Sequence, residues 1–271
     1  MEVLNHMDTN NLANEIRKLS LKSIHAARSG HPGGSFSIAE LLAILYFEEM
    51  NLRPDEPNWQ DRDRFILSKG HACPALYAAL ALKGYFPEDD CLGLRKIESY
   101  LEGHPDVRTP GIDAASGSLG MGLSQGMGYA MGAKHQNKDF RTYVLLGDGD
   151  MQEGNTWEAL MCAAHHNLDN LVAIYDANLL QGDDFVENQM NMHPMDEKIK
   201  SFGWSFIEID GHDTDAIRSA LKKAGETPDK PTFILANTVK GKGVSFMENI
   251  QFWHGSVTMT DEQLNDALAE L

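Results

Sequence analysis

The sequence predicts an α/β fold, a doubly wound parallel sheet with helices on both faces. Short apolar runs alternate with helical segments along the second half of the chain, an order typical of parallel sheets. Each run is apolar at consecutive positions, which indicates strands covered on both faces. We find no internal repeat, low-complexity tract or long linker in the 271 residues, so we expect one domain spanning residues 1–271.

The first half of the sequence predicts two helices, one strand and a glycine-rich loop. Residues 11–28 and 38–47 carry apolar residues at helical spacing, and the turn SGHPGG lies between them. Residues 64–67 form a short apolar run that ends in SKGHA, which predicts a strand followed by a loop. The small-residue stretch 117–134 is expected to lead from a loop into a helix whose glycines and alanines allow close packing.

The second half repeats a strand–helix pattern. The expected strands are residues 143–146, 171–175, 205–209 and 232–236. The expected helices are residues 153–166 and 216–224, with a further helix-like segment at 260–271. Ligands bind beyond the carboxyl ends of the strands in such sheets. This rule marks three segments that each follow a predicted strand, namely 147–149, 176–178 and 238–243.

Charge and composition exclude several classes of partner. The 40 acidic residues outnumber the 23 basic ones, and a net charge of −17 argues against binding a nucleic acid backbone. No apolar run approaches the roughly 20 residues that span a bilayer, and no secretory signal is visible, so we expect a cytoplasmic protein with no membrane partner. Cys73, Cys91 and Cys162 show no metal-binding spacing and are expected to be buried thiols.

Asp148 and Asn178 carry the strongest chemical signal. Asp148 lies in a GDG motif at the end of one predicted strand, and Asn178 follows the next strand thirty positions later. A carboxylate, an amide oxygen and a backbone carbonyl are hard ligands suited to Mg²⁺ or Ca²⁺, and Mg²⁺ often completes its shell with phosphate oxygens. Gly149 leaves room for a diphosphate near a helix N-terminus. The motif alone leaves open a dinucleotide-binding or metal-phosphatase function.

Four histidines decide between these alternatives. His31, His71, His104 and His254 each lie in a glycine-containing turn, in the sequences SGHPGG, SKGHA, EGHPD and WHG. A single histidine in a loop is usually solvated, but four beside a diphosphate site favour a catalytic role. Imidazoles can hydrogen-bond a sugar hydroxyl, move its proton or donate to a phosphate oxygen.

The motifs resemble those of a known family. GDG followed by the asparagine is similar to the thiamine diphosphate motif. The segments SGHPGG, SKGHA, GSLGMG, GDGDMQEG and KGKG…WHG occur in the order found in the N-terminal, diphosphate-binding domain of transketolases. The similarity runs from about Leu19 to His254, and it implies the thiamine diphosphate-binding fold.

The resemblance implies a set of residues around the cofactor. The metal ligands would be Asp148, Asn178 and the carbonyl of Leu180. The cofactor would be held by His71, Gly117, Ser118, Leu119, Gly149, Asn178, Lys240 and His254. The catalytic histidines, which would contact the ketose donor and the acceptor, would be His31, His104 and His254. The metal would be Mg²⁺, with Ca²⁺ or Mn²⁺ as alternatives.

The resemblance also implies a partner chain. In this family the glutamate that activates the cofactor and the arginines that bind the substrate phosphate belong to a following pyrimidine-binding domain. Because the sequence ends at Leu271, we expect the N-terminal subunit of a split transketolase of the pentose phosphate pathway, completed by a C-terminal subunit in a heterotetramer. The reaction would transfer a two-carbon ketol unit from a ketose to an aldose phosphate.

Three alternatives remain open: a split enzyme for a branched or sulfonated sugar, a deoxyxylulose phosphate synthase-like subunit, and a non-catalytic regulatory or assembly protein that binds the cofactor. Two details depart from the common family pattern. The segment 248–253 before WHG lacks the second histidine of many relatives, and the loop 179–184 leaves the role of Gln181 open. Glu153 and Glu158 are acids of the kind favoured near a helix start, and the resemblance alternatively implies that Glu153 lies in an acidic cluster at the subunit interface.

Overall fold

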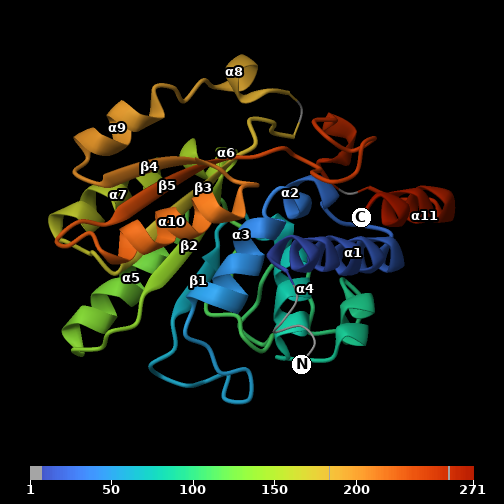
Figure 1. The fold of residues 1–271 in the computed structure, drawn as a ribbon, viewed down its shortest axis with the longest axis horizontal. Helices are drawn as coiled ribbons and strands as arrows, with labels where there is room; N and C mark the ends of the chain where they lie inside the picture. Colours follow the sequence, from blue (N-terminus) through green and yellow to red (C-terminus); the bar gives the residue numbers. More distant parts are fainter. Residues whose placement is uncertain (1–7, 183, 256) are drawn as a thin grey trace.

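A five-stranded parallel sheet forms the centre of the molecule (Figure 1). The computed structural model describes residues 8–182, 184–255 and 257–271. The strands lie in the order β1-β2-β3-β5-β4. Their bounds are Arg64–Leu67 for β1, Thr142–Gly147 for β2, Leu171–Ala177 for β3, Ser205–Asp210 for β4 and Thr232–Asn237 for β5. All five predicted strands are confirmed, and all but β1 are one or two residues longer than predicted.

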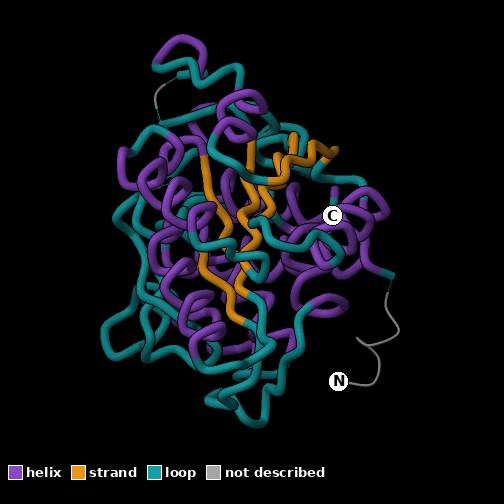
Figure 2. Tube along the Cα trace, turned by 90° about the vertical axis from the view of Figure 1, so that its left-hand side faces the viewer, coloured by secondary structure: helices purple, strands orange, loops and turns teal. Residues whose placement is uncertain are grey.

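The inner strands are buried on both faces, as their continuous apolar runs predict. Every residue of β2 and β3 is buried, and so is every residue of the edge strand β1, whereas β4, at the other edge of the sheet, is only partly covered. Figure 2 shows the strands between two layers of helices. The predicted α/β fold with helices on both faces is therefore confirmed.

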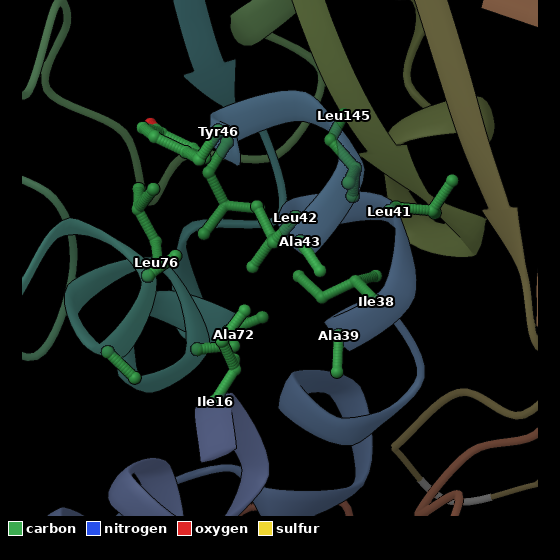
Figure 3. Close-up of a cluster of buried hydrophobic side chains, with 14 of the residues drawn as sticks. Ile16, Ile38, Ala39, Leu41, Leu42, Ala43, Tyr46, Ala72, Leu76 and Leu145 are labelled. Carbon is green, nitrogen blue, oxygen red and sulfur yellow. The ribbon is translucent and has the colours of Figure 1, made fainter. Parts of the chain in front are cut away.

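One face of the sheet carries the larger core. It is covered by α1 (Thr9–Ala27), α3 (Ala39–Ile44), α4 (Cys73–Lys83) and α10 (Thr214–Gly225). Figure 3 shows Leu145 of the sheet in one apolar cluster with side chains from these helices, among them Ile16, Leu42 and Leu76. Helix α1 begins at the N-cap Asp8, whose carboxylate accepts from the amide of Asn10.

The opposite face is covered by α5 (Gly122–His135) and α7 (Gly154–His165). Alternation along β2 divides its side chains between the cores, with Val144 and Leu146 on this side. The prediction that small residues bring a helix close is confirmed at Gly126, where a Cβ would lie 2.2 Å from the Cγ2 of Val144. Helix α5 therefore packs directly on the strand that precedes the GDG motif.

One predicted helix changes geometry in the structure, and another is preceded by a short helix that was not predicted. The helix predicted over 38–47 consists of α3 followed by η2 (Leu45–Glu49), a wider π-helical turn. A short helix, α6 (Asp148–Met151), begins directly after β2, and Glu153 then serves as the N-cap of α7. The GDG motif is therefore a strand end joined to a helix start and not a simple turn.

Short elements complete the chain. They are α2 (Pro32–Phe36), η3 (Gly70–Ala72), η4 (Glu88–Gly93), α8 (Val186–Gln189), α9 (Met195–Ser201), η5 (Gln251–Trp253) and α11 (Asp261–Glu270). Within the described ranges, none of the helices combines the length and apolar character required to cross a bilayer. Cys73 and Cys91 are buried as predicted, but Cys162 is only half-buried because it lies beside the buried stripe of α7.

Candidate active site

A cavity of about 250 Å³ lies where the carboxyl ends of four neighbouring strands meet. Each of β1, β2, β3 and β5 leads into a segment that lines it, as expected for a parallel sheet. The lining residues are His31, Gly34, Lys69, His71, Gly117, Leu119, Gly147, Asp148, Gly149, Asp150, Asn178, Leu180, Gln181, Gly182, Lys240 and His254. The fold thus brings together every residue predicted for the site except His104 and Ser118.

The three predicted metal ligands lie in this cavity. The hydroxyl of Tyr175 donates to Oδ1 of Asp148 at 2.7 Å, and burial raises the pKa of this carboxyl to about 6. The side chain of Asn178 donates to Oδ2 of Asp176 at 2.9 Å, while its Oδ1 accepts from the amide of Leu180 at 3.3 Å. Asn178 is therefore anchored on both sides.

Lys240 occupies the space between the predicted metal ligands and a histidine. Its ammonium donates to the carbonyl of Leu180 and, at 2.8 Å, to Nδ1 of His254. Burial, followed by the charge of Lys69, lowers the pKa of Lys240 to about 8. A carbonyl oxygen has two lone pairs, so Leu180 can accept from Lys240 and still contact a cation.

The donor set fits a hard metal ion bridged to a diphosphate. One carboxylate, one amide and one carbonyl are the oxygen donors that Mg²⁺ and Ca²⁺ prefer. Over residues 8–182, 184–255 and 257–271, no three His, Cys, Asp or Glu side chains gather in a metal-binding arrangement, as a zinc site would require. A Cβ at Gly34 would lie 3.4 Å from Nζ of Lys69 and 3.5 Å from Nε2 of His71, so the glycine keeps this cationic corner open to an anion.

Three histidine rings face one another across the cavity. The ring centroids of His31 and His71 are 5.1 Å apart, those of His31 and His254 5.8 Å, and those of His71 and His254 5.6 Å. Burial and neighbouring positive charges lower the pKa of His31 to about 4 and that of His254 to about 3, and they hold the pKa of His71 well below its ordinary value. These imidazoles are neutral near pH 7 and can both donate and accept hydrogen bonds.

Of the residues predicted in the glycine-rich loop, Gly117 and Leu119 line the cavity and Ser118 does not. A Cβ at Gly149 would lie 2.8 Å from Cδ1 of Leu119, so the leucine packs against the GDG motif. Ser118 is exposed and does not line the cavity. His104 is also exposed and lies outside the lining, with its ring 3.2 Å from where a Cβ of Gly117 would be. His104 therefore lies at the rim of the cavity.

The charged pair Lys69 and Asp176, in the floor of the cavity, was not predicted from the sequence. Their side chains, 2% and 0% exposed, form an ion pair. Ser37 and Thr238 also donate to Asp176, and Lys69 donates to the carbonyl of Gly34. Burial alone would raise the pKa of Asp176, but Lys69 and the hydrogen bonds outweigh it and lower the pKa. A signal was present, since both residues stand at the end of a buried apolar strand.

A second residue that was not predicted is Asp150, which joins two of the motifs. Its Oδ1 accepts from the hydroxyl of Ser68 at 2.5 Å and from the amide of Gly120 at 2.7 Å, and its Oδ2 accepts from the amide of Gly147 at 2.9 Å. The carboxylate is completely buried, and burial raises its pKa. Asp150 therefore fixes the glycine-rich loop relative to the GDG motif.

Three residues of open role can also be placed. Gln181 lines the cavity and exchanges two hydrogen bonds of 2.9 Å with Gln152. Glu153 and Glu158 are exposed on the surface of the chain. A role for Glu153 at a subunit interface stays a prediction.

The fold and cavity together define a parallel α/β domain with a polar ligand site at the carboxyl edge of its sheet. Residues 8–268 match the sequence model of the transketolase thiamine diphosphate-binding domain. The chain belongs to the transketolase family and corresponds to the thiamine diphosphate-binding domain of that family.

Several relatives show how much of a transketolase the chain represents. It is 45% identical over 266 residues to SqwG, the 6-deoxy-6-sulfo-D-fructose transketolase subunit of a Clostridium species, covering 98% of this chain and 96% of that one. It is 41% identical to one of the apulose-4-phosphate transketolase subunits of Phocaeicola vulgatus, covering 94% and 90% of the two chains. Against human transketolase it is 42% identical, but it spans only 39% of that protein. The structure of Leishmania mexicana transketolase superimposes with a TM-score of 0.93 at 33% identity, over 97% of this chain and 41% of that one.

Proposed function

We propose that the chain is the N-terminal subunit of a split transketolase, which transfers a two-carbon ketol unit from a ketose to an aldose phosphate. The observation that carries the proposal is the single cavity in which three histidines face the GDG motif, Asn178 and Lys240. We further propose that residues 1–271 form one domain of the transketolase N-terminal type, acting in the cytoplasm.

Residues on one side of the cavity would hold the cofactor. Asp148, Asn178 and the carbonyl of Leu180 would bind Mg²⁺, which Ca²⁺ or Mn²⁺ could replace. The diphosphate would contact Gly149, His71 and Lys240, while Gly117 and Leu119, with the exposed Ser118 between them, would support the rest of the molecule. Thiamine diphosphate, when bound, supplies the reactive carbon for ketol transfer, and the protein supplies binding and orientation.

The histidines would act on the sugar. Because the pKa values of His31 and His254 are lowered by burial, both imidazoles are neutral and can accept a proton from a substrate hydroxyl or donate one to it. His104, at the rim, would contact the part of the substrate farther from the cofactor. Lys240 donates to Nδ1 of His254, which leaves the Nε2 proton of that ring available to a ligand.

A separate C-terminal subunit would complete the site. Two observations support this arrangement: the chain covers 96% and 90% of the two relatives named as subunits, and only 39% of human transketolase. The partner would supply the pyrimidine-binding domain, and the two chains would assemble as a heterotetramer. The exposed Glu153 would then become part of the interface.

A second candidate concerns the sugar. The relative with 45% identity is named for a sulfonated ketose and the one with 41% identity for apulose phosphate, so an unusual sugar is a specific alternative to the pentose phosphates. A panel of phosphorylated and sulfonated ketoses, assayed with the complete complex, distinguishes the two. Turnover of only the sulfonated or branched members would establish the alternative.

Calorimetry of thiamine diphosphate with the chain tests the cofactor site. We expect binding that requires Mg²⁺ and is lost in Asp148→Ala. Replacement of His31 by Asn should abolish turnover of the complex while leaving the fold unchanged. Unchanged turnover would favour the non-catalytic alternative of a regulatory or assembly protein.

A further inference from the structure

Arg95 lies between the two turns that carry His31 and His104, although it does not line the cavity. Its Nη1 donates to the hydroxyl of Ser29 at 2.6 Å, and its Nη2 donates to Nδ1 of His31 at 3.4 Å. On the other side, a Cβ at Gly103 would lie 2.9 Å from Nε of Arg95, so the turn before His104 passes over the guanidinium. One side chain thus contacts both histidine turns.

The backbone of Arg95 is strained to achieve this placement. Its φ is +58°, in the left-handed region that side chains with a Cβ enter at a cost. Its amide nevertheless donates to the carbonyl of Leu101 at 2.9 Å, which holds the conformation. Backbone strain of this kind is often found at functional sites, where it holds a side chain in a required position.

The charge of Arg95 lacks a carboxylate partner within the described part of the chain. None of the salt bridges there involves this guanidinium, and its buried Nε donates to no acceptor. The groups that it contacts are instead the hydroxyl of Ser29 and Nδ1 of His31, and its positive charge lowers the pKa of both His31 and His104. Burying a charge without an opposite charge costs free energy. Such charges beside titratable groups are typical of functional sites, where they shift the pKa of their neighbours.

We propose that Arg95 is a positioning residue that holds His31 in the tautomer with its proton on Nε2. A guanidinium is only a donor, so Nδ1 of His31 must accept and the proton must reside on Nε2. The ring edge that carries Nε2 is turned toward Gly255, where a Cβ would lie 2.3 Å from this nitrogen. This inference rests on the proposed function, in which His31 contacts the sugar.

The same arrangement keeps His31 neutral. The positive groups around its ring come from several segments: Arg95 after η4, Lys69 after β1 and Lys240 after β5, with the imidazoles of His71, His104 and His254 also nearby. Burial is the largest cause of its lowered pKa and Arg95 the second. Loss of Arg95 should therefore free the tautomer and raise the pKa of His31 toward its ordinary value.

Nitrogen chemical shifts of the histidines, measured on the ¹⁵N-histidine-labelled chain alone, test the proposal directly. The signal of His31 is identified by its absence in His31→Asn. We expect the Nε2–H tautomer in the wild-type chain and a mixture of tautomers with a higher pKa in Arg95→Met. Arg95→Lys keeps the charge but cannot contact Ser29 and His31 together, so it should retain the low pKa and lose the single tautomer.

A matched control is Arg28→Met. Arg28 also has a left-handed φ, of +51°, but its side chain is exposed, so its replacement should leave the His31 signal unchanged. In the complex, Arg95→Met should lower kcat about 10- to 100-fold, as for other residues that orient a catalytic group, without changing thiamine diphosphate affinity. A wild-type chain with the proton of His31 on Nδ1, or an Arg95→Met variant with the wild-type signal, would overturn the proposal. Both outcomes are measured from histidine signals of the chain alone, so they do not depend on whether the proposed reaction occurs.

Discussion

The hydroxyl of Tyr175 donates a hydrogen bond of 2.7 Å to Oδ1 of Asp148, inside the edge of the sheet where the cofactor site is proposed. Both side chains are buried. Within the described residues, Oδ2 of Asp148 accepts no hydrogen bond, so it is the oxygen left for a metal ion. The pair therefore orients the carboxylate before any ligand arrives.

We predict that Tyr175→Phe weakens binding of thiamine diphosphate in the presence of Mg²⁺ about 10- to 100-fold, the usual effect of removing a group that orients a metal ligand. Calorimetric titration measures the affinity. The matched control is Tyr143→Phe, because Tyr143 donates to the carboxylate of Glu49 at the same distance of 2.7 Å but does not line the cavity. Equal affinities for the two variants would contradict the role of Tyr175.

Asp150→Asn should loosen the contact between the glycine-rich loop and the GDG motif. An amide cannot accept from all three of the donors Ser68, Gly120 and Gly147, so one buried donor loses its partner. We expect a loss of about 1–3 kcal/mol in the free energy of unfolding, together with weaker cofactor binding. Urea unfolding and calorimetry measure the two effects. Asp139→Asn, at an exposed aspartate, should change neither, and an Asp150→Asn variant as stable as wild type would be the contrary result.

Gly120→Ala and Gly128→Ala form a second matched pair. Gly120 has a φ of +81°, and a Cβ there would lie 2.4 Å from Cβ of Glu153, whereas a Cβ at Gly128 meets no atom within 4 Å. The first substitution should destabilise the fold by at least about 1–2 kcal/mol. The second should stabilise helix α5 by up to about 1 kcal/mol. Thermal unfolding decides the prediction, and it fails if both variants shift the melting temperature in the same direction.

Glu40 makes the stability depend on pH. Burial would raise the pKa of Glu40, but the hydrogen bond from His212 and the charge of Arg17, 2.6 Å away, lower it. A lowered pKa in the folded state stabilises the protein above the unfolded value of about 4.3, and this contribution disappears as the pH falls through the folded value. Glu40→Gln should therefore cost about 3–5 kcal/mol at pH 7, because it leaves the charge of Arg17 buried without a carboxylate partner, and much less once the pH is below the lowered folded pKa.

Urea unfolding of wild type and Glu40→Gln between pH 3 and pH 7 measures this difference. The double variant Arg17→Met, Glu40→Gln is the control, since it leaves no unpaired charge and should be more stable than the single variant. A stability difference that is independent of pH would show that the charge of Glu40 contributes nothing.

The strands were well predicted from the sequence because their burial on both faces leaves an unambiguous apolar run. Local pattern was a weaker guide where a helix changes geometry, as at Leu45–Glu49, where the π-helical turn has the same apolar spacing as an α-helix. It also missed the short helix α6, at whose start the carboxylate of Asp150 accepts from the amide of Gly147.

The sequence predicted those residues of the candidate site that lie in short motifs. It missed the residues whose role depends on a partner far away in the sequence. Lys69 and Asp176 are separated by 107 residues, and their pairing arises only when β1 and β3 are ordered in the sheet. Arg95 gives no sequence signal, since a left-handed φ is expected at glycine. Motif order located the cavity, whereas the groups that orient its residues required the three-dimensional structure.

The proposed division of the active site between two chains can be tested by reconstitution. The decisive experiment is ketol transfer by the purified chain, with thiamine diphosphate and Mg²⁺, titrated with a separately purified C-terminal subunit that carries the pyrimidine-binding domain. We expect turnover that appears only on mixing and becomes maximal at equal molar amounts of the two chains. Substantial ketol transfer by the 271-residue chain alone would refute the split-enzyme proposal.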